Sequence, residues 1–279
     1  MERMKQMQAA NLKIIKEVDR ICRKHGIHYL LDAGTLIGAI RHKGFIPWDD
    51  DVDFAFLREE YEKFIKAAKE ELPEGIHLWF PTDSAKYGAF YDFTPKLVYE
   101  NSRKRLPDED TAFYKEEMNH ICADIFILDE ISENPLERKW QILLNKIIYG
   151  MAMGHRRKLD FSKYSFLQRL QVAVLAGVGS VINMETLCKW ERRAALRQTN
   201  GTSSLLYYSN YEPGYVHMIV PREGSQQILE VPFEDMQVMI PKGYDNVLKV
   251  VYGDYMTLPP RETRKPKHGE VEAEGFFVR

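Results

Sequence analysis

The stretch from residue 30 to residue 56, LLDAGTLIGAIRHKGFIPWDDDVDFAF, constrains the fold and chemistry of this chain more than any other part. Within five residues it carries four aspartates: Asp49, Asp50, Asp51 and Asp53. Carboxylates this close repel one another, and a bound cation offsets that cost. The segment from Asp51 onward alternates polar and apolar residues, so in a strand Asp51 and Asp53 project from the same face. Two carboxylates on one face predict an oxygen clamp for a hard divalent ion.

The acidic run has a second interpretation as a solvated turn, which is the commoner place for such runs. Apolar segments on both sides, residues 45–48 and 54–56, favour an ordered position instead, and a turn needs no alternation. Upstream, Gly34 allows the backbone to approach a phosphate closely. The hydroxyl of Thr35 and the N–H groups that open the following helix can hold phosphate oxygens. The stretch therefore predicts a joint metal and phosphate site.

Composition argues against several other classes of protein. The net charge of −2 supplies no basic field for nucleic acid, so we expect no nucleic-acid partner. The cysteines, Cys22, Cys122 and Cys188, are odd in number, widely spaced and without a CxxC pair. They indicate neither a disulfide framework nor a zinc site, and they fit a reducing cytoplasm. The N-terminal segment lacks the apolar core of a signal peptide.

Hydrophobic periodicity predicts an α/β (α+β) chain in three parts. A core over residues 1–133 should contain helices over 4–24, 35–41 and 59–72 and strands over 27–31, 51–56, 76–80, 94–99 and 120–129. A helical block over 134–200, packed on the sheet or inserted into it, should contain helices over 136–153, 166–182 and 184–198. The part from 201 to 279 should contain a strand over 205–209, a hairpin and turn over 231–244 and a helix over 245–252. We expect residues 101–118 to be irregular and the basic C-terminal tail to be mobile apart from one docked contact.

The most apolar run of the chain, residues 172–182, reads VAVLAGVGSVI. It is too short to span a bilayer, which needs about 20 residues. We expect a buried helix there, and a patch that touches the membrane is the alternative. We therefore expect the protein in the cytoplasm, and peripheral contact with the inner membrane face is the alternative.

Asp124 lies in the middle of the apolar segment 120–129. A charge inside a buried strand is costly unless it is paired or bound to a metal, and a paired core acid is the alternative. Together with Asp51 and Asp53 it would hold one or two Mg²⁺ (or Mn²⁺) ions and help to deprotonate an acceptor hydroxyl. Phosphoryl transfer depends mainly on such positioning and charge neutralisation.

Other residues are weaker candidates, because each residue type is found at least as often in a solvated or core position. We expect Asp49 to lie beside the metal ligands and Asp50 to cap or bond the loop. Phosphate contacts are expected from Arg41, His42 and Lys96. A cage for a quaternary ammonium group, held by cation–π contacts, would draw on Trp48, Tyr87, Tyr91 and Tyr255. His268 in the basic tail is a further candidate for a residue that reaches the site.

Residues 34–42, GTLIGAIRH, followed by residues 45–53, FIPWDDDVD, resemble the LicD family of phosphotransferases, which includes bacterial phosphocholine transferases and fukutin-related proteins. The likeness recurs downstream and covers nearly the whole chain. One departure is Ile127, which stands where the family commonly has proline. The downstream segments are DIFILD at 124–129, PKGY at 241–244, YGDYM at 252–256 and the prolines at 259–260.

The resemblance implies a nucleotidyltransferase-like fold with a mixed sheet flanked by helices. It assigns metal binding and catalysis to Asp51, Asp53 and Asp124, and the phosphates to Gly34 and Thr35. It also implies a reaction. A CDP-activated alcohol, typically CDP-choline, donates its phosphoalcohol to a hydroxyl of a cell-surface glycan, a teichoic-acid-type precursor or a lipid-linked glycan, and CMP is released.

Three rival interpretations remain. A metal-dependent glycosyltransferase would use Asp51-Val52-Asp53 as the DxD motif that binds a nucleotide-sugar, although no Gly-Thr helix is expected before it. A non-catalytic protein that binds a divalent ion or a glycan is a second rival, but the spacing does not match the twelve-residue calcium loop. A degenerate scaffold is the third, and the three carboxylates argue against it.

Overall fold

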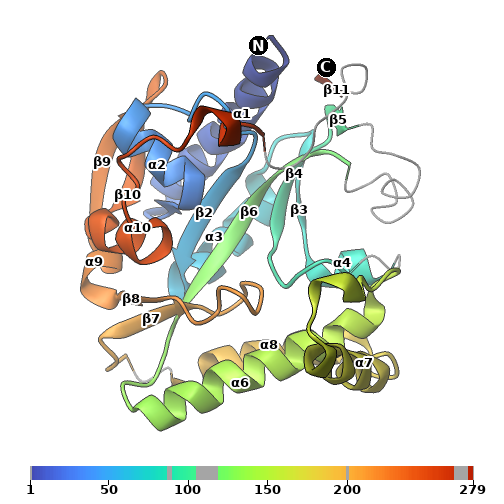
Figure 1. The fold of residues 1–279 in the computed structure, drawn as a ribbon. Helices are drawn as coiled ribbons and strands as arrows, with labels where there is room; N and C mark the ends of the chain where they lie inside the picture. Colours follow the sequence, from blue (N-terminus) through green and yellow to red (C-terminus); the bar gives the residue numbers. More distant parts are fainter. Residues whose placement is uncertain (1, 87–89, 105–118, 199–200, 267–275, 279) are drawn as a thin grey trace.

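Seven strands of the described residues form a mixed sheet, in which the order β1-β2-β6-β4-β3 is extended by β7 beside β6 and β8 beside β7 (Figure 1). The structure is a computed structural model that describes residues 2–86, 90–104, 119–198, 201–266 and 276–278. The strands are β1 (Leu30–Leu31), β2 (Val52–Leu57), β3 (Ile76–Trp79), β4 (Lys96–Tyr99), β6 (Ile121–Glu130), β7 (Leu205–Tyr208) and β8 (Ile219–Pro221).

The central pair of strands, β2 and β6, is parallel, and its residues are buried on both faces. Helices cover such strands on both sides, which explains the long apolar runs in their sequences. Two helices, α1 (Glu2–His25) and α3 (Arg58–Glu71), contact β6 and each other. The apolar stripe expected on the first helix faces this core: Ile15, Val18 and Ile21 are fully buried.

A second layer lies beside β1. The hairpin of β9 (Ile228–Phe233) and β10 (Met236–Pro241) contacts β1 and α2 (Ala33–His42). The helices α9 (Arg222–Gln226) and α10 (Tyr244–Tyr252) adjoin it. This arrangement confirms the expected α/β class with a mixed sheet flanked by helices, and it confirms the predicted hairpin.

Between β6 and β7 the chain forms a helical block that lies along the lower edge of Figure 1. It consists of α6 (Pro135–Ala152), η1 (Met153–His155), η2 (Phe161–Lys163), α7 (Phe166–Gly179), α8 (Met184–Ala195) and η3 (Leu196–Gln198). After the block the chain forms β7, which pairs with the end of β6 and places Tyr208 opposite Leu128. The block packs around a separate hydrophobic cluster, which includes its own Tyr149 and Leu187 and also Phe93 from the segment before β4. The division at residues 133 and 200 stays a prediction.

Several local expectations were wrong. The first strand is limited to Leu30–Leu31, and the helix after it begins at Ala33 rather than at Thr35, because Asp32 accepts the first helical hydrogen bond from Leu36. Part of the segment expected to be irregular, β5 (Ser102–Lys104), pairs with β11 (Phe276–Val278) from the C-terminal tail. The short helix α4 (Pro81–Lys86) was not predicted.

The expectation of a buried helix over 172–182 was also wrong. Of α7, only the side that carries Val172, Leu175, Ala176 and Gly179 turns inward, and the rest is exposed. Among the described residues, no single helix is both long and apolar enough to cross a membrane. The pair α7 and α8 reaches the required apolarity only when taken together, and the two helices are bent by 117°.

A buried charge cluster joins the helical block to the sheet. The guanidinium of Arg58 donates to both carboxylate oxygens of Asp129, from Nε at 2.9 Å and from Nη2 at 2.6 Å. The hydroxyl of Ser209 donates to the same carboxylate at 2.5 Å. Glu191 of α8 lies beside this pair, and no described residue donates to its buried Oε1. Burial, opposed by Arg58, raises the pKa of Glu191 to about 8.

The raised pKa of Glu191 predicts a pH-dependent stability. A carboxyl group with an ordinary pKa of 4.5 when unfolded and about 8 when folded binds more protons in the native state between these values. The free energy of unfolding therefore falls as pH rises from about 5 to about 8. We expect Glu191→Gln to stabilise the protein more at pH 8 than at pH 5, measured by thermal unfolding. An equal effect at both pH values would contradict the assignment.

Candidate active site

Strand register places acidic and basic side chains in one row across the sheet. Asp53 of β2 lies opposite Asp124 of β6, and Asp124 lies opposite Lys96 of β4. Asp32, just after β1, donates its N–H to the carbonyl of Asp53 at 3.0 Å and extends the row. Residues directly opposite on neighbouring strands have Cβ atoms about 5 Å apart and project from the same face. Two carboxylates that are 71 positions apart in the sequence thus become neighbours.

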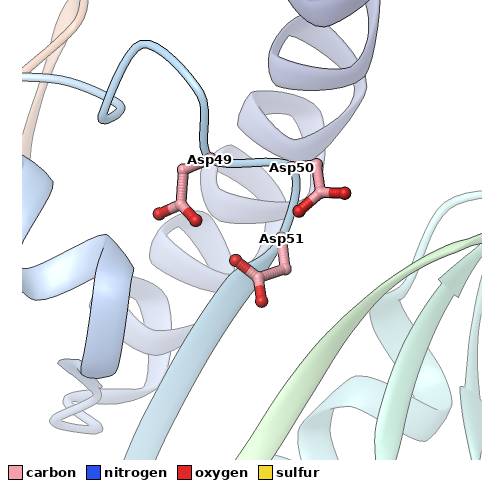
Figure 2. A group of neighbouring side chains, drawn as sticks. All are labelled: Asp49, Asp50 and Asp51. Atoms are coloured by element: carbon pink, nitrogen blue, oxygen red, sulfur yellow. The ribbon is translucent and has the colours of Figure 1, made fainter. Parts of the chain in front are cut away.

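The loop that enters β2 adds three more carboxylates. One oxygen each of Asp49, Asp50 and Asp51 lies within 4.8 Å of the others. Figure 2 shows the carboxylates of Asp49 and Asp51 turned to the same side of the loop and that of Asp50 turned away from it. Helix α1 holds this loop from behind, because the side-chain amides of Gln8 and Asn11 donate to the carbonyls of Asp49 and Asp50, each at 3.1 Å.

The expected set of metal ligands is close together but does not form the tightest group. Among the described residues, the acidic group whose oxygens all lie within 4.8 Å is Asp49, Asp50 and Asp51 rather than Asp51, Asp53 and Asp124. Asp124 is held on the other side by Lys96. That each of these residues binds a metal stays a prediction.

Asp53 lies at the electrostatic centre of the site. Its side chain is buried, and burial raises its pKa well above the usual range. The negative charges of Asp51, Asp124, Asp32 and Asp49 raise it further, in that order. Four carboxylates that act on one group make full ionisation costly unless a cation is near. This is the charge pattern expected of a site for a divalent ion with oxygen ligands.

Lys96 is a buried cation committed to two carboxylates. Its Nζ lies 2.6 Å from Oδ1 of Asp124 and 3.5 Å from Oδ2 of Asp92. Burial alone would lower the pKa of Lys96, but Asp124 and Asp92 outweigh it and hold the pKa well above the usual value. Lys96 therefore orients Asp124 beside Asp53, and its expected contact with phosphate stays a prediction.

Sequence reasoning missed the role of Asp32. It precedes α2 as the N-terminal cap, is buried, and accepts a hydrogen bond from the hydroxyl of Tyr208 at 3.2 Å. Burial raises its pKa to about 6. The next residue, Ala33, has φ of 45°, a left-handed conformation that is costly for a residue with a side chain. In the sequence, an aspartate before a helix indicates a helix cap. No local signal shows that this aspartate also belongs to the acidic row.

Gly34 and Thr35 lie at the start of α2, next to the aspartates. A Cβ on Gly34 would lie 2.6 Å from Oδ2 of Asp49, so only glycine leaves room for that carboxylate. The Thr35 hydroxyl is buried and accepts a hydrogen bond from the N–H of Asp53 at 3.0 Å. It joins the helix to β2 and keeps its own proton for donation. The positive end of α2 is thereby fixed against the acidic row.

The other expected contacts gather at the opposite end of α2. Arg41 is about 9 Å further along the helix than Thr35, at 1.5 Å per residue. It donates to the carbonyl of Tyr255 at 2.6 Å and to the ring of His42 at 3.0 Å. Trp48 lies edge-on to His42. Burial and the positive charge of the nearby Arg264 lower the pKa of Arg41. Arg41, His42 and Arg264 therefore form a second group of side chains, which we call the cationic group.

The aromatic candidates are divided between these places. Tyr91 lies beside Lys96, whose Nζ is 5.8 Å from its ring centroid, whereas Trp48 and Tyr255 belong to the cationic group. Tyr87 and His268 lie outside the described residues.

Comparison with known proteins agrees with the residues of this site. The family described as LicD/FKTN/FKRP, nucleotidyltransferase domain, matches residues 26–177, which include β2, β6 and α2. The chain is 29% identical over 281 aligned positions to the lipopolysaccharide cholinephosphotransferase LicD of Haemophilus influenzae, covering 95% of this chain and 96% of that protein. An uncharacterized protein of Rickettsia typhi is 37% identical over 59 residues, 21% of this chain and 19% of its own length.

The crowding of carboxylates around Asp53 predicts a metal-dependent stability. In EDTA at pH 8, Asp53→Asn should raise the melting temperature by about 2–4 °C, since it removes the cost of ionising a buried carboxyl group beside four others. Mg²⁺ or Mn²⁺ should stabilise the wild type and have little effect on this variant, measured by thermal unfolding.

The control is Asp235→Asn, which removes an exposed carboxylate paired with Lys16. This variant should have nearly the same melting temperature as the wild type, both in EDTA and with the divalent ion. If the divalent ion stabilised Asp53→Asn as much as the wild type, Asp53 would not be a ligand.

Proposed function

Because this chain belongs to the LicD/FKTN/FKRP nucleotidyltransferase-domain family, we propose that it transfers a phosphoalcohol from a CDP-activated donor to a glycan hydroxyl and releases CMP. Phosphocholine is the proposed phosphoalcohol, since a relative that matches over 95% of the chain is named a lipopolysaccharide cholinephosphotransferase. The observation that carries the proposal is the pairing of Asp53 with Asp124 beside the N-terminus of α2.

The proposed reaction exchanges one phosphate ester bond. The oxygen of the glycan hydroxyl attacks the phosphorus that carries choline, and the bond from that phosphorus to the CMP oxygen breaks. The hydroxyl proton passes to a carboxylate, for which Asp124 is the candidate, and CMP leaves with the negative charge. Lys96 keeps Asp124 oriented, and Asp51 and Asp53 are the proposed ligands of Mg²⁺ or Mn²⁺. The ion would neutralise the diphosphate of the donor.

The start of α2 is the proposed cradle for that diphosphate. Its N–H groups and positive helix end favour an anion, and the Thr35 hydroxyl can donate toward it. Gly34 makes room for the Asp49 carboxylate at this end, whereas Arg41 and His42 lie further along the same helix. We propose that these two residues contact the nucleotide end of the donor rather than the reacting phosphorus.

Aromatic residues near Asp53 support choline as the alcohol. Burial, followed by the negative charge of Asp53, raises the pKa of both Tyr211 and Tyr252, so both hydroxyls lie within electrostatic reach of Asp53. The ring of Tyr211 stacks on that of Tyr215 with centroids 4.6 Å apart. Aromatic faces next to carboxylates suit a quaternary ammonium group. Ribitol and glycerol remain the alternatives that the assay below separates.

We further propose that the acceptor is lipopolysaccharide, a teichoic-acid-type precursor or another lipid-linked glycan. The relative from Haemophilus influenzae is named for lipopolysaccharide. A CDP-activated donor is a cytoplasmic metabolite, so the proposed place of reaction is the cytoplasm at the inner membrane face.

The reaction predicts a specific product. With Mg²⁺ and lipopolysaccharide as acceptor, the wild type should release CMP from CDP-choline faster than from CDP-ribitol or CDP-glycerol, measured by chromatography. Asp124→Asn should lower kcat at least about 10²-fold, the usual scale for losing a general base. Asp235→Asn, remote from the site, should retain the wild-type rate.

Two outcomes would contradict the proposal. Release of UDP from UDP-sugars without release of CMP would identify a glycosyltransferase. Full turnover by Asp51→Ala in the presence of metal would remove the acidic clamp from the mechanism.

A further inference from the structure

Helix α7 carries Arg169 as its one charged residue and is mostly apolar, yet most of it is exposed. Its inward side contacts η1 through Ala176, which lies against Gly154, and α6 through Gly179, where a Cβ would clash with the backbone of Met151. The opposite side forms what we name the outer face of α7, an arc of about 120° at 100° per residue. Its residues, which are between 51% and 86% exposed, are Phe166, Leu167, Leu170, Val174, Val178 and the following Val181.

The apolar surface continues along α6. Leu136, Trp140 and Leu143 are exposed and lie on the side of α6 that also carries Gly150, because positions 136, 140, 143 and 150 follow helical spacing. Gly150 contacts Leu175 of α7. The outer face of α7 and this stripe therefore lie on the same side of the helical block, and isolated apolar residues on a surface do not form such a series.

Charge on the helical block is opposite to that of the rest of the chain. Residues 135–198 contain 12 Lys and Arg and 4 Asp and Glu, a formal charge of +8, so the remainder carries −10 in a chain of net charge −2. The outer face of α7 itself carries no charged residue, and Arg169 lies at its flank. An apolar helix face on a block with an excess of basic residues fits docking in the interface of an anionic bilayer.

We propose that the helical block docks on an anionic lipid bilayer, with the outer face of α7 lying in the headgroup region. We propose docking rather than spanning because α8, which follows α7 at a bend of 117°, is packed into the block through the buried side chains of Met184 and Leu187. The choice of a bilayer over a protein rests on the +8 charge, because anionic lipids attract each Lys or Arg near the surface.

The block is tied directly to the candidate active site. Arg156, just after α6, donates to the carbonyl of Tyr91, and Tyr149 of α6 donates to the same carbonyl at 3.2 Å. The next residue, Asp92, pairs with Lys96 in the acidic row. A docked block would hold this edge of the site close to the headgroups. The link to a lipid-linked acceptor rests on the proposed function, whereas docking itself does not.

Vesicle co-sedimentation of the full chain, without donor or acceptor, tests the proposal. The wild type should bind vesicles of equal parts phosphatidylcholine and phosphatidylglycerol and should not bind phosphatidylcholine alone. Raising the salt from about 0.1 M to about 1 M should weaken binding, because screening shortens from about 10 Å to about 3 Å. The double variant Leu170→Glu with Val174→Glu should lower the partition coefficient at least tenfold.

A matched control places the same change elsewhere. Leu229→Glu with Val250→Glu alters two exposed apolar residues outside the block and should bind vesicles like the wild type. Both double variants should keep the wild-type melting temperature, since the four side chains are exposed.

Three results would overturn the docking. The first is absence of wild-type binding to the anionic vesicles, and the second is equal binding by the α7 variant. The third is a wild type that is a dimer in sedimentation velocity and an α7 variant that is a monomer, which would assign the face to a second copy of the chain. Vesicle binding without CMP release would leave the docking intact and remove the proposed function instead.

Discussion

Carboxylates at the start of β2 repel one another, and the rest of this site has to offset that repulsion. Asp53 is buried among four other aspartates, so its charge is unfavourable unless a cation offsets it. The fold nevertheless holds the group together from several sides. Thr35 fixes Asp53 through its N–H, Asn11 of α1 fixes the loop, and glycine at position 34 leaves space for Asp49. Native structure that maintains so costly an arrangement indicates a function for it.

The sheet and the helical block contribute different parts of the account. The parallel pairing of β2 with β6 sets Asp53 beside Asp124, and the antiparallel β4 supplies Lys96 to orient it. The helical block leaves and rejoins the sheet at β6 and β7, contacts the site through Tyr91, and carries the excess of positive charge. The proposed donor site, which is acidic, and the proposed lipid-docking surface, which is basic and apolar, thus occupy adjoining parts of one chain.

The sequence was sufficient for some of this and not for the rest. Alternation and apolar flanks predicted β2 and β6 and their aspartates, because strand periodicity is local. The register that pairs Asp53 with Asp124 depends on contacts between distant segments, so periodicity could not predict it. Asp32 has a local interpretation as a helix cap that conceals its place in the acidic row. The exposure of α7 was missed because its apolar composition is equally typical of a buried core helix.

The most direct test of the central claim is to locate a divalent ion in the protein. Crystals grown with Mn²⁺ and CDP-choline can be measured near the manganese absorption edge, and an anomalous difference map then shows where the ion lies. We predict a peak between the carboxylates of Asp51 and Asp53, with Asp124 facing it and the donor diphosphate at the start of α2. A bound donor with no peak at these carboxylates, or with manganese held elsewhere, would contradict it.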